Sequence, residues 1–174
     1  FTEPDFTDII TPEMIAGNGN SLDDPGSILI AESLARALFG NADALNKTVK
    51  LNNNFTQKVT GVYKDFPGNS RSGDIKFIAP VTVLVKNNFV FDSWKSSSFE
   101  VFALVNENSN QKVISSKIKD ILYINSKDAS KPELILHPMS KWHLYQYKNR
   151  NLEEGRAQFV WLFGVIDVLV LLLA

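Results

Sequence analysis

The two histidines, His137 and His143, are the side chains of this sequence whose type could hold a metal or act as a general base. They stand six residues apart, on either side of a segment that begins with Pro138. This spacing across a proline does not place two imidazoles on one helix face, and no cysteine is present to complete a zinc site. We interpret His137 as a hydrogen-bonded residue at a strand end and His143 as partly buried.

A hydrolase that uses His137 or His143 with nearby acids is the enzymatic alternative. It would need an activated serine and a pocket with a perturbed carboxylate, and nothing local marks any serine as activated. The acid pairs Asp23-Asp24 and Glu153-Glu154 are interpreted as solvated loop residues. The sequence therefore predicts a protein that is not an enzyme, with no catalytic, cofactor-binding or metal-binding residue and no cofactor.

Residues 40–48 contain the glycine, lysine and threonine of a phosphate loop, at the wrong spacing. The segment is one residue too long, and Asn46 stands where a glycine must let the backbone approach the phosphate. It also follows a predicted helix and precedes a predicted strand, which is the reverse of the required order. These differences argue against a nucleotide site.

Composition sets the broad class of the protein. The chain has 174 residues, of which 44% are hydrophobic and 21% charged, so it can form one domain or two small lobes with a core of ordinary size. The net charge of −1 gives no reason to expect nucleic-acid binding, which depends on an excess of basic side chains. The absence of cysteine excludes thiol catalysis and disulfides.

The elements that must position these residues are predicted next. In the first half, residues 27–30 form a short buried strand, and residues 32–38 form a helix with Leu34 and Leu38 on one face and Gly40 as its C-cap. Residues 48–51 and 58–63 form a strand pair that turns at the asparagines 52–54. Residues 65–74 form a loop, and residues 77–85 form either a strand or a helix.

A polar hinge at residues 92–98 is predicted to separate two lobes. Residues 99–105 then form a strand, and Asn110 caps a helix whose apolar positions are Ile114, Ile118, Ile121 and Leu122. Residues 133–137 form another strand. Strand, helix and strand in this order predict a βαβ-like unit with its helix packed on a sheet.

Residues 159–174 are apolar except for Gly164 and Asp167. As a helix this run is about 24 Å long, shorter than a hydrocarbon core of about 30 Å. It is either the truncated start of a membrane helix or a C-terminal core helix, and Asp167 favours the second because a carboxylate at membrane depth is costly. The residues just before it are a membrane-proximal stalk or an ordinary surface segment; they include Trp142, Tyr145, Tyr147, Lys148 and Arg150.

Five segments in one consistent order resemble the MacB-like periplasmic core domain and the start of the FtsX-like permease region, in the form found in large Bacteroidetes permeases. They are residues 24–30 (DPGSILI), 33–40 (SLARALFG), 59–70 (VTGVYKDFPGNS), 136–145 (LHPMSKWHLY) and 158–164 (QFVWLFG). The resemblance implies an α+β fold: a β-rich Sabre-like lobe at residues 1–95, the second half of a porter-like βαβ lobe at residues 96–150, and a stalk with the truncated start of a transmembrane helix at residues 151–174.

The resemblance also implies the function. The domain lies on the periplasmic side of the bacterial inner membrane and belongs to an ABC transporter permease. It couples ATP hydrolysis by a cytoplasmic ATPase subunit mechanically to export or to a periplasmic partner protein, with a second permease copy or repeat as another partner. A helical stalk at residues 153–161 is expected to carry the movement. In similar proteins an apolar or small residue is usual where this chain has Asp167. The alternative is a stand-alone soluble periplasmic binding module.

Overall fold

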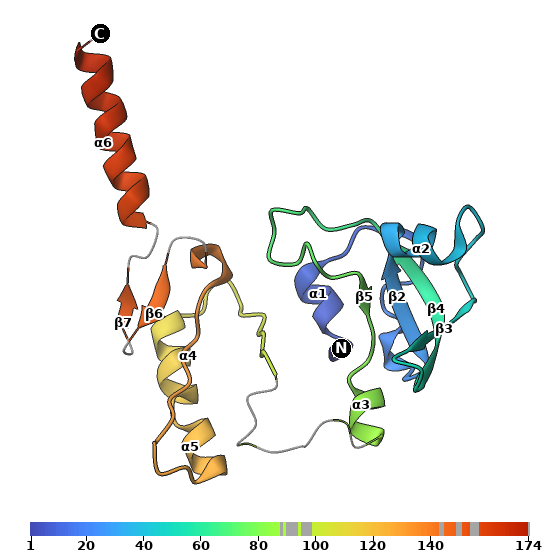
Figure 1. Ribbon diagram of the computed structural model, residues 1–174. Helices are drawn as coiled ribbons and strands as arrows, with labels where there is room; N and C mark the ends of the chain where they lie inside the picture. The colour runs from blue at the N-terminus through green and yellow to red at the C-terminus, as the bar shows by residue number, and fades with distance from the viewer. Residues whose placement is uncertain are drawn as a thin grey trace. The chain divides into compact units, whose positions relative to one another are not determined.

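The computed structural model describes residues 1–87, 89, 94, 99–142, 145–148, 151–153 and 157–173. The chain divides into two compact units, which we call unit 1 (Phe1–Asn106) and unit 2 (Glu107–Ala174). Figure 1 shows a sheet with short helices in unit 1, and helices with a small hairpin in unit 2. The predicted α+β class is confirmed, and the structure shows that the sheet of unit 1 is mixed.

Unit 1 is organised around β4 (Phe55–Tyr63), the longest strand of a five-stranded sheet. β2 (Ser27–Ala31) runs parallel to it along one edge. The other edge of β4 is shared by two antiparallel strands, β3 (Thr48–Leu51) at its start and β1 (Met14–Gly17) at its end. β5 (Phe77–Ile78) extends the sheet beyond β2.

Every residue of β2 is buried, because both faces of the sheet are covered. Side chains alternate along a strand, so Ile28 and Ile30 enter one apolar cluster while Leu29 and Ala31 enter the other. The first cluster is packed by α2 (Glu32–Phe39) and the second by α1 (Phe6–Ile10). The continuous apolar run that predicted a buried strand is thus explained by helices on both faces.

α2 and its C-cap glycine are confirmed. Gly40 has a positive φ of 63°, and its N–H donates to the carbonyl of Arg36 over 2.9 Å. Leu34 and Leu38 lie one helical turn apart as predicted, but Leu38 is 52% exposed. The residues of α2 that pack in the core are Ala35, Leu34 and Phe39.

The predicted strand pair is confirmed as β3 and β4, although β4 begins at Phe55 rather than at residue 58. Asn52 and Asn53 make the turn with φ of 49° and 58°, a conformation that asparagine tolerates well. Residues 77–85 were predicted to form either a strand or a helix, and they contain both, since β5 is followed by α3 (Thr82–Lys86). Residues 65–74 form the predicted loop. Strand β1 and helix α1 were not predicted.

Unit 2 begins with α4 (Gln111–Ile118), and Asn110 is its N-cap as predicted, because its side chain accepts from the N–H groups of Lys112 and Val113. The predicted single helix is divided at residues 119–120, and α5 (Ile121–Ser126) follows. At the division the carbonyl of Lys119 accepts from the N–H of Leu134 instead of continuing the helical ladder.

The two strands predicted around these helices are not formed. Residues 99–105 contact the rest of unit 1 through side chains. Glu100 forms an ion pair with Arg71, and the ring centroids of Phe102 and Phe6 lie 5.5 Å apart. Val101 and Leu104 are 91% and 80% exposed. Residues 133–137 bond to the helices, for example through Gln111 Nε2 to the carbonyl of Leu136. A strand needs a ladder partner, and among the described residues neither segment has one.

Unit 2 ends in a hairpin of β6 (Gln146–Lys148) and β7 (Asn151–Glu153), followed by α6 (Ala157–Leu173). The predicted helical stalk at residues 153–161 is therefore wrong at its first residue, because Glu153 is the last residue of strand β7. A C-terminal core helix is also wrong, since residues 158–172 of α6 are all exposed. Among the described residues, no helix is both long and apolar enough to cross a membrane. Of the predicted hinge at residues 92–98, only Trp94 is described.

Candidate functional site

A polar junction in unit 1 joins the end of β4 to the start of α2 and to the residue before β5. Asp65 Oδ2 accepts from the backbone N–H of Ser33 over 2.8 Å, and Asp65 Oδ1 accepts from Lys76 Nζ over 2.7 Å. The Ser33 hydroxyl donates to the same Oδ1. Ala31, the N-cap residue of α2, has no polar side chain to cap the helix, so Asp65 supplies the cap from the loop that follows β4.

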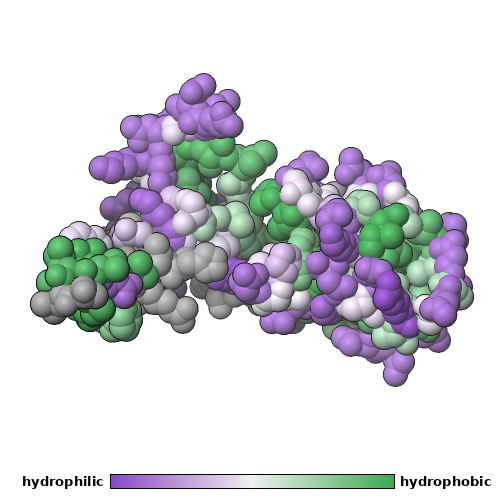
Figure 2. Space-filling model, turned by 90° about the horizontal axis from the view of Figure 1, so that it is seen from above, coloured by the Kyte–Doolittle hydropathy of each residue, from purple (hydrophilic) through white to green (hydrophobic). Residues whose placement is uncertain are grey.

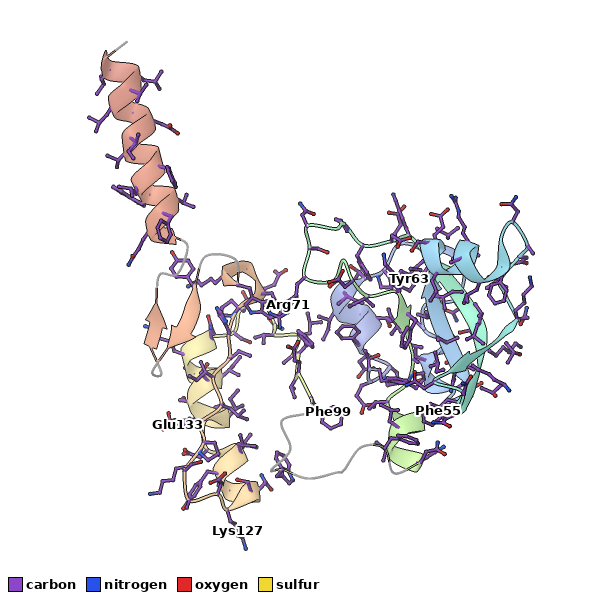
Figure 3. All side chains as sticks on the ribbon, in the orientation of Figure 1. Phe55, Tyr63, Arg71, Phe99, Lys127 and Glu133 are labelled. Carbon is purple, nitrogen blue, oxygen red and sulfur yellow. The ribbon has the colours of Figure 1, made fainter. Side chains whose placement is uncertain are left out.

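These donors change the electrostatics of the junction. The hydrogen bond from Lys76, followed by that from Ser33, lowers the pKa of Asp65 from 3.8 to about 2. Tyr63 lies two residues earlier within the packed side chains of unit 1 (Figure 3), and its hydroxyl donates to the carbonyl of Ile75 over 3.0 Å. Burial first, and the Asp65 charge second, raise the pKa of Tyr63.

The junction contains a serine, a lysine and a carboxylate, but their arrangement fits structural support. A general base must take a proton near the working pH, and a carboxylate with a pKa of about 2 is far too weak to deprotonate Ser33. Both Asp65 oxygens already accept from protein donors. The junction therefore fixes α2 against the sheet.

The histidines are not brought into a site by the described residues. His137 is half-buried, and its ring lies edge-on to Trp142 with centroids 6.5 Å apart. His143 lies outside the described residues. Within the described part of the chain, no three His, Asp or Glu side chains lie close enough together to hold a metal ion.

Residues 40–48 use their amides internally. The N–H groups of Leu45, Asn46 and Lys47 donate to Asp43 Oδ1, the Val59 carbonyl and the Ala44 carbonyl. A phosphate loop needs such N–H groups to point at its ligand. The segment instead connects α2 to β3.

The other candidate residues have local roles. Asp24 Oδ1 accepts from the N–H of Gly26 over 2.8 Å and so shapes the turn before β2. Glu153 ends β7, while Glu154 and Arg150 lie outside the described residues. Lys141 Nζ lies 5.9 Å from the ring centroid of Tyr145. Tyr147 and Lys148 are part of β6.

The most distinctive surface is that of α6. Its apolar side chains extend in all directions around the helix (Figure 3), and hydrophobic residues cover the end of α6 in the space-filling view (Figure 2). Leu172 is 78% exposed. Exposed apolar surfaces of this kind are typical of sites for protein or membrane contact.

Residues 1–121 match the model of the MacB-like periplasmic core domain family. The chain belongs to this family. Its place is therefore the periplasmic side of an ABC permease of the MacB/FtsX-like group, a family that is typically non-catalytic. The resemblance to the MacB-like periplasmic core domain is confirmed, and the matched residues include three of the five segments that carried it: 24–30, 33–40 and 59–70. No curated protein sequence matches the chain.

Among the solved structures that share the fold of this MacB-like domain are the following two. One is the periplasmic region of MacB from Actinobacillus actinomycetemcomitans, with a TM-score of 0.52 and 17% identity, and the match covers 77% of this chain and 58% of that one. The other is a domain of a protein assigned as a permease from Porphyromonas gingivalis, with a TM-score of 0.51 and 23% identity. That match covers 72% of this chain and 53% of the other. The chain thus spans little more than half the length of either structure.

The importance of Asp65 was missed by sequence reasoning, although a signal was present. Asp65 lies within residues 59–70, one of the five segments that carry the MacB-like resemblance. The structure shows that this segment includes both the end of β4 and the carboxylate that caps α2. Its donors come from Ser33 and Lys76, which are distant in sequence, so no local pattern could have identified them.

Proposed function

We propose that this domain transmits movement between the membrane part of an ABC permease and the periplasm. The observation that carries the proposal is the exposed apolar helix α6, which follows the β6–β7 hairpin in a chain of the MacB-like periplasmic core domain family. A cytoplasmic ATPase subunit would drive the movement, and α6 would enter the bilayer as the start of a transmembrane helix. The partner moved would be an exported cargo or another periplasmic protein.

Within this proposal, residues 1–95 are the Sabre-like lobe and residues 96–150 are the second half of a porter-like lobe. Residues 151–174 connect the porter-like lobe to the membrane. The connection contains the hairpin of β6 and β7, with α6 starting at Ala157. Movement that starts in the membrane would therefore pass from α6 through the hairpin to the porter-like lobe.

The membrane part of the proposal is tested by single-cysteine labelling in a permease without other cysteines, to which these 174 residues contribute none. Asn54→Cys and Leu172→Cys both place the thiol at an exposed position of the fold. In spheroplasts that express the permease, we expect an impermeant maleimide to label position 54 and to reach position 172 only after detergent is added. Labelling of position 172 without detergent would favour the stand-alone binding module.

The transmission part is tested by inserting a Gly/Ser linker after Glu153 in the whole permease. A flexible linker should leave ATP hydrolysis active while export falls, because the displacement is absorbed by the linker. The matched control is a linker of equal length in the exposed turn at residues 52–54, which lies outside the connection. Undiminished export with the linker after Glu153 would contradict mechanical transmission.

A further inference from the structure

Asp167 is an unusual residue for its position in α6. Asp167 is the one charged residue in the sequence of α6. It lies ten residues after Ala157, which is about 15 Å along the axis at about 1.5 Å per residue. If α6 enters the bilayer as proposed, this carboxyl lies near the middle of a hydrocarbon core of about 30 Å.

The Asp167 side chain cannot reach water from that depth. Long lysine and arginine stems extend to the membrane interface, whereas the aspartate side chain is short. Ionisable residues within a membrane segment usually face other helices and bind a partner there. The described part of α6 offers no cation to pair with it.

Gly164 makes the face of α6 that carries Asp167 accessible to another helix. It lies three residues before Asp167, so the two positions are neighbours on the helix surface. A Cβ placed on Gly164 would meet no atom within 4 Å. A glycine next to a polar residue permits close backbone approach, which is how helices associate in membranes.

We propose that the Gly164–Asp167 face of α6 binds a second transmembrane helix that carries a lysine or arginine. Charge complementarity selects this partner. A basic side chain donates hydrogen bonds to the carboxylate and neutralises it, whereas a second copy of α6 would bring two carboxylates together. The inference rests on the proposed function, because it requires α6 to lie in lipid.

The test uses the 174-residue chain in phosphatidylcholine vesicles together with synthetic polyleucine transmembrane helices. The probe helices carry a central lysine, a central leucine or a central aspartate. Energy transfer from a dye on Asn54→Cys to a dye on the probe helix measures association. We expect the chain to bind the lysine helix about 3- to 30-fold more tightly than the leucine helix, the range typical of interhelical polar contacts.

Variants identify the contact. Asp167→Leu should abolish the preference for the lysine helix, and Asp167→Asn should retain a small part of it because the amide lacks the charge. Gly164→Ile should weaken binding by keeping the backbones apart. Leu169→Phe adds bulk on the opposite face of α6 and should leave binding unchanged. All of these substitutions lie outside unit 1, so unit 1 should fold equally well in every variant, and its folding serves as an internal check.

The outcomes separate the two proposals. If a thiol at Leu172→Cys is protected from an impermeant maleimide but lysine and leucine helices bind equally, this inference fails while the proposed function stands. Preference for the aspartate helix would also overturn it, because it would indicate pairing of carboxyls. If the thiol at position 172 is labelled in intact vesicles, α6 is not in lipid and both fail.

Discussion

The two units differ in how they use their apolar side chains. Unit 1 buries Ile30, Val59 and Tyr63 completely between helices on both faces of a sheet. In unit 2, helix α4 has no buried residue, and Ile124 of α5 is 65% exposed. Similar side chains therefore stabilise the fold in one unit and remain on the surface in the other. Among the described residues, unit 1 therefore has the larger packed apolar core.

The largest expected effect comes from an isoleucine pair that tests this difference directly. Ile30→Ala removes a fully buried side chain from β2 and should lower the free energy of unfolding of unit 1 by about 2–5 kcal/mol. Ile124→Ala removes the same atoms from an exposed position and should change stability by less than about 0.5 kcal/mol. Urea denaturation of both variants measures the contrast. Equal losses would show that unit 2 has an apolar core of its own.

A glycine pair sharpens the account of the unit 1 sheet. Gly17 has a φ of 78°, and an added Cβ would lie 2.2 Å from the Thr60 carbonyl oxygen of β4. Gly17→Ala should therefore lower the unfolding free energy by about 2–4 kcal/mol, through strain and a backbone clash. Gly40→Ala also has a positive φ but open space around its Cβ, so it should cost about 1–3 kcal/mol from backbone strain alone, without the clash. Thermal melts of the two variants should rank them in this order.

Asp65 provides the next test within unit 1. Asp65→Asn weakens the cap of α2 and removes the ion pair with Lys76, so a loss of about 1–2 kcal/mol is expected at pH 7. The pKa of Asp65 is lowered to about 2 from 3.8, so its contribution is present above pH 4 and is lost as the pH falls from 4 to 2. The unfolding free energies of wild type and variant should converge over that interval. Asp23→Asn changes an exposed carboxylate and is the control for the loss of a surface charge; it should change the unfolding free energy at pH 7 by less than about 0.5 kcal/mol.

The smallest effect is expected from an ion pair in unit 2. Lys119 Nζ lies 3.2 Å from Glu133 Oε1 and joins the break between α4 and α5 to residues 133–137. Glu133→Gln should lower stability by about 0.5–1 kcal/mol, and added salt should reduce the difference. Glu13→Gln breaks the more exposed Lys64 pair of unit 1 and should cost less. A larger loss at Glu13 would indicate that surface charge matters more in the packed unit.

Sequence reasoning succeeded where the signal was local. The apolar run of β2, the glycine after α2 and the asparagines before β4 each carry their conformational preference within a few residues. It failed at residues 99–105 and 133–137, where strand-like alternation is present but a ladder partner is not. It also missed the role of Asp65, because the two donors that define it lie in distant parts of the sequence.

The position of β4 has a consequence for the order in which unit 1 assembles. Its pairing with β3 joins neighbours in sequence through the short turn at residues 52–54, and such a hairpin forms in about 1–10 μs. Its pairings with β2 and β1 close much longer loops, which slows them. We therefore expect β3 and β4 to meet first, with β2 and then β1 added to this template. Hydrogen exchange during refolding should protect the amides of β3 before those of β1.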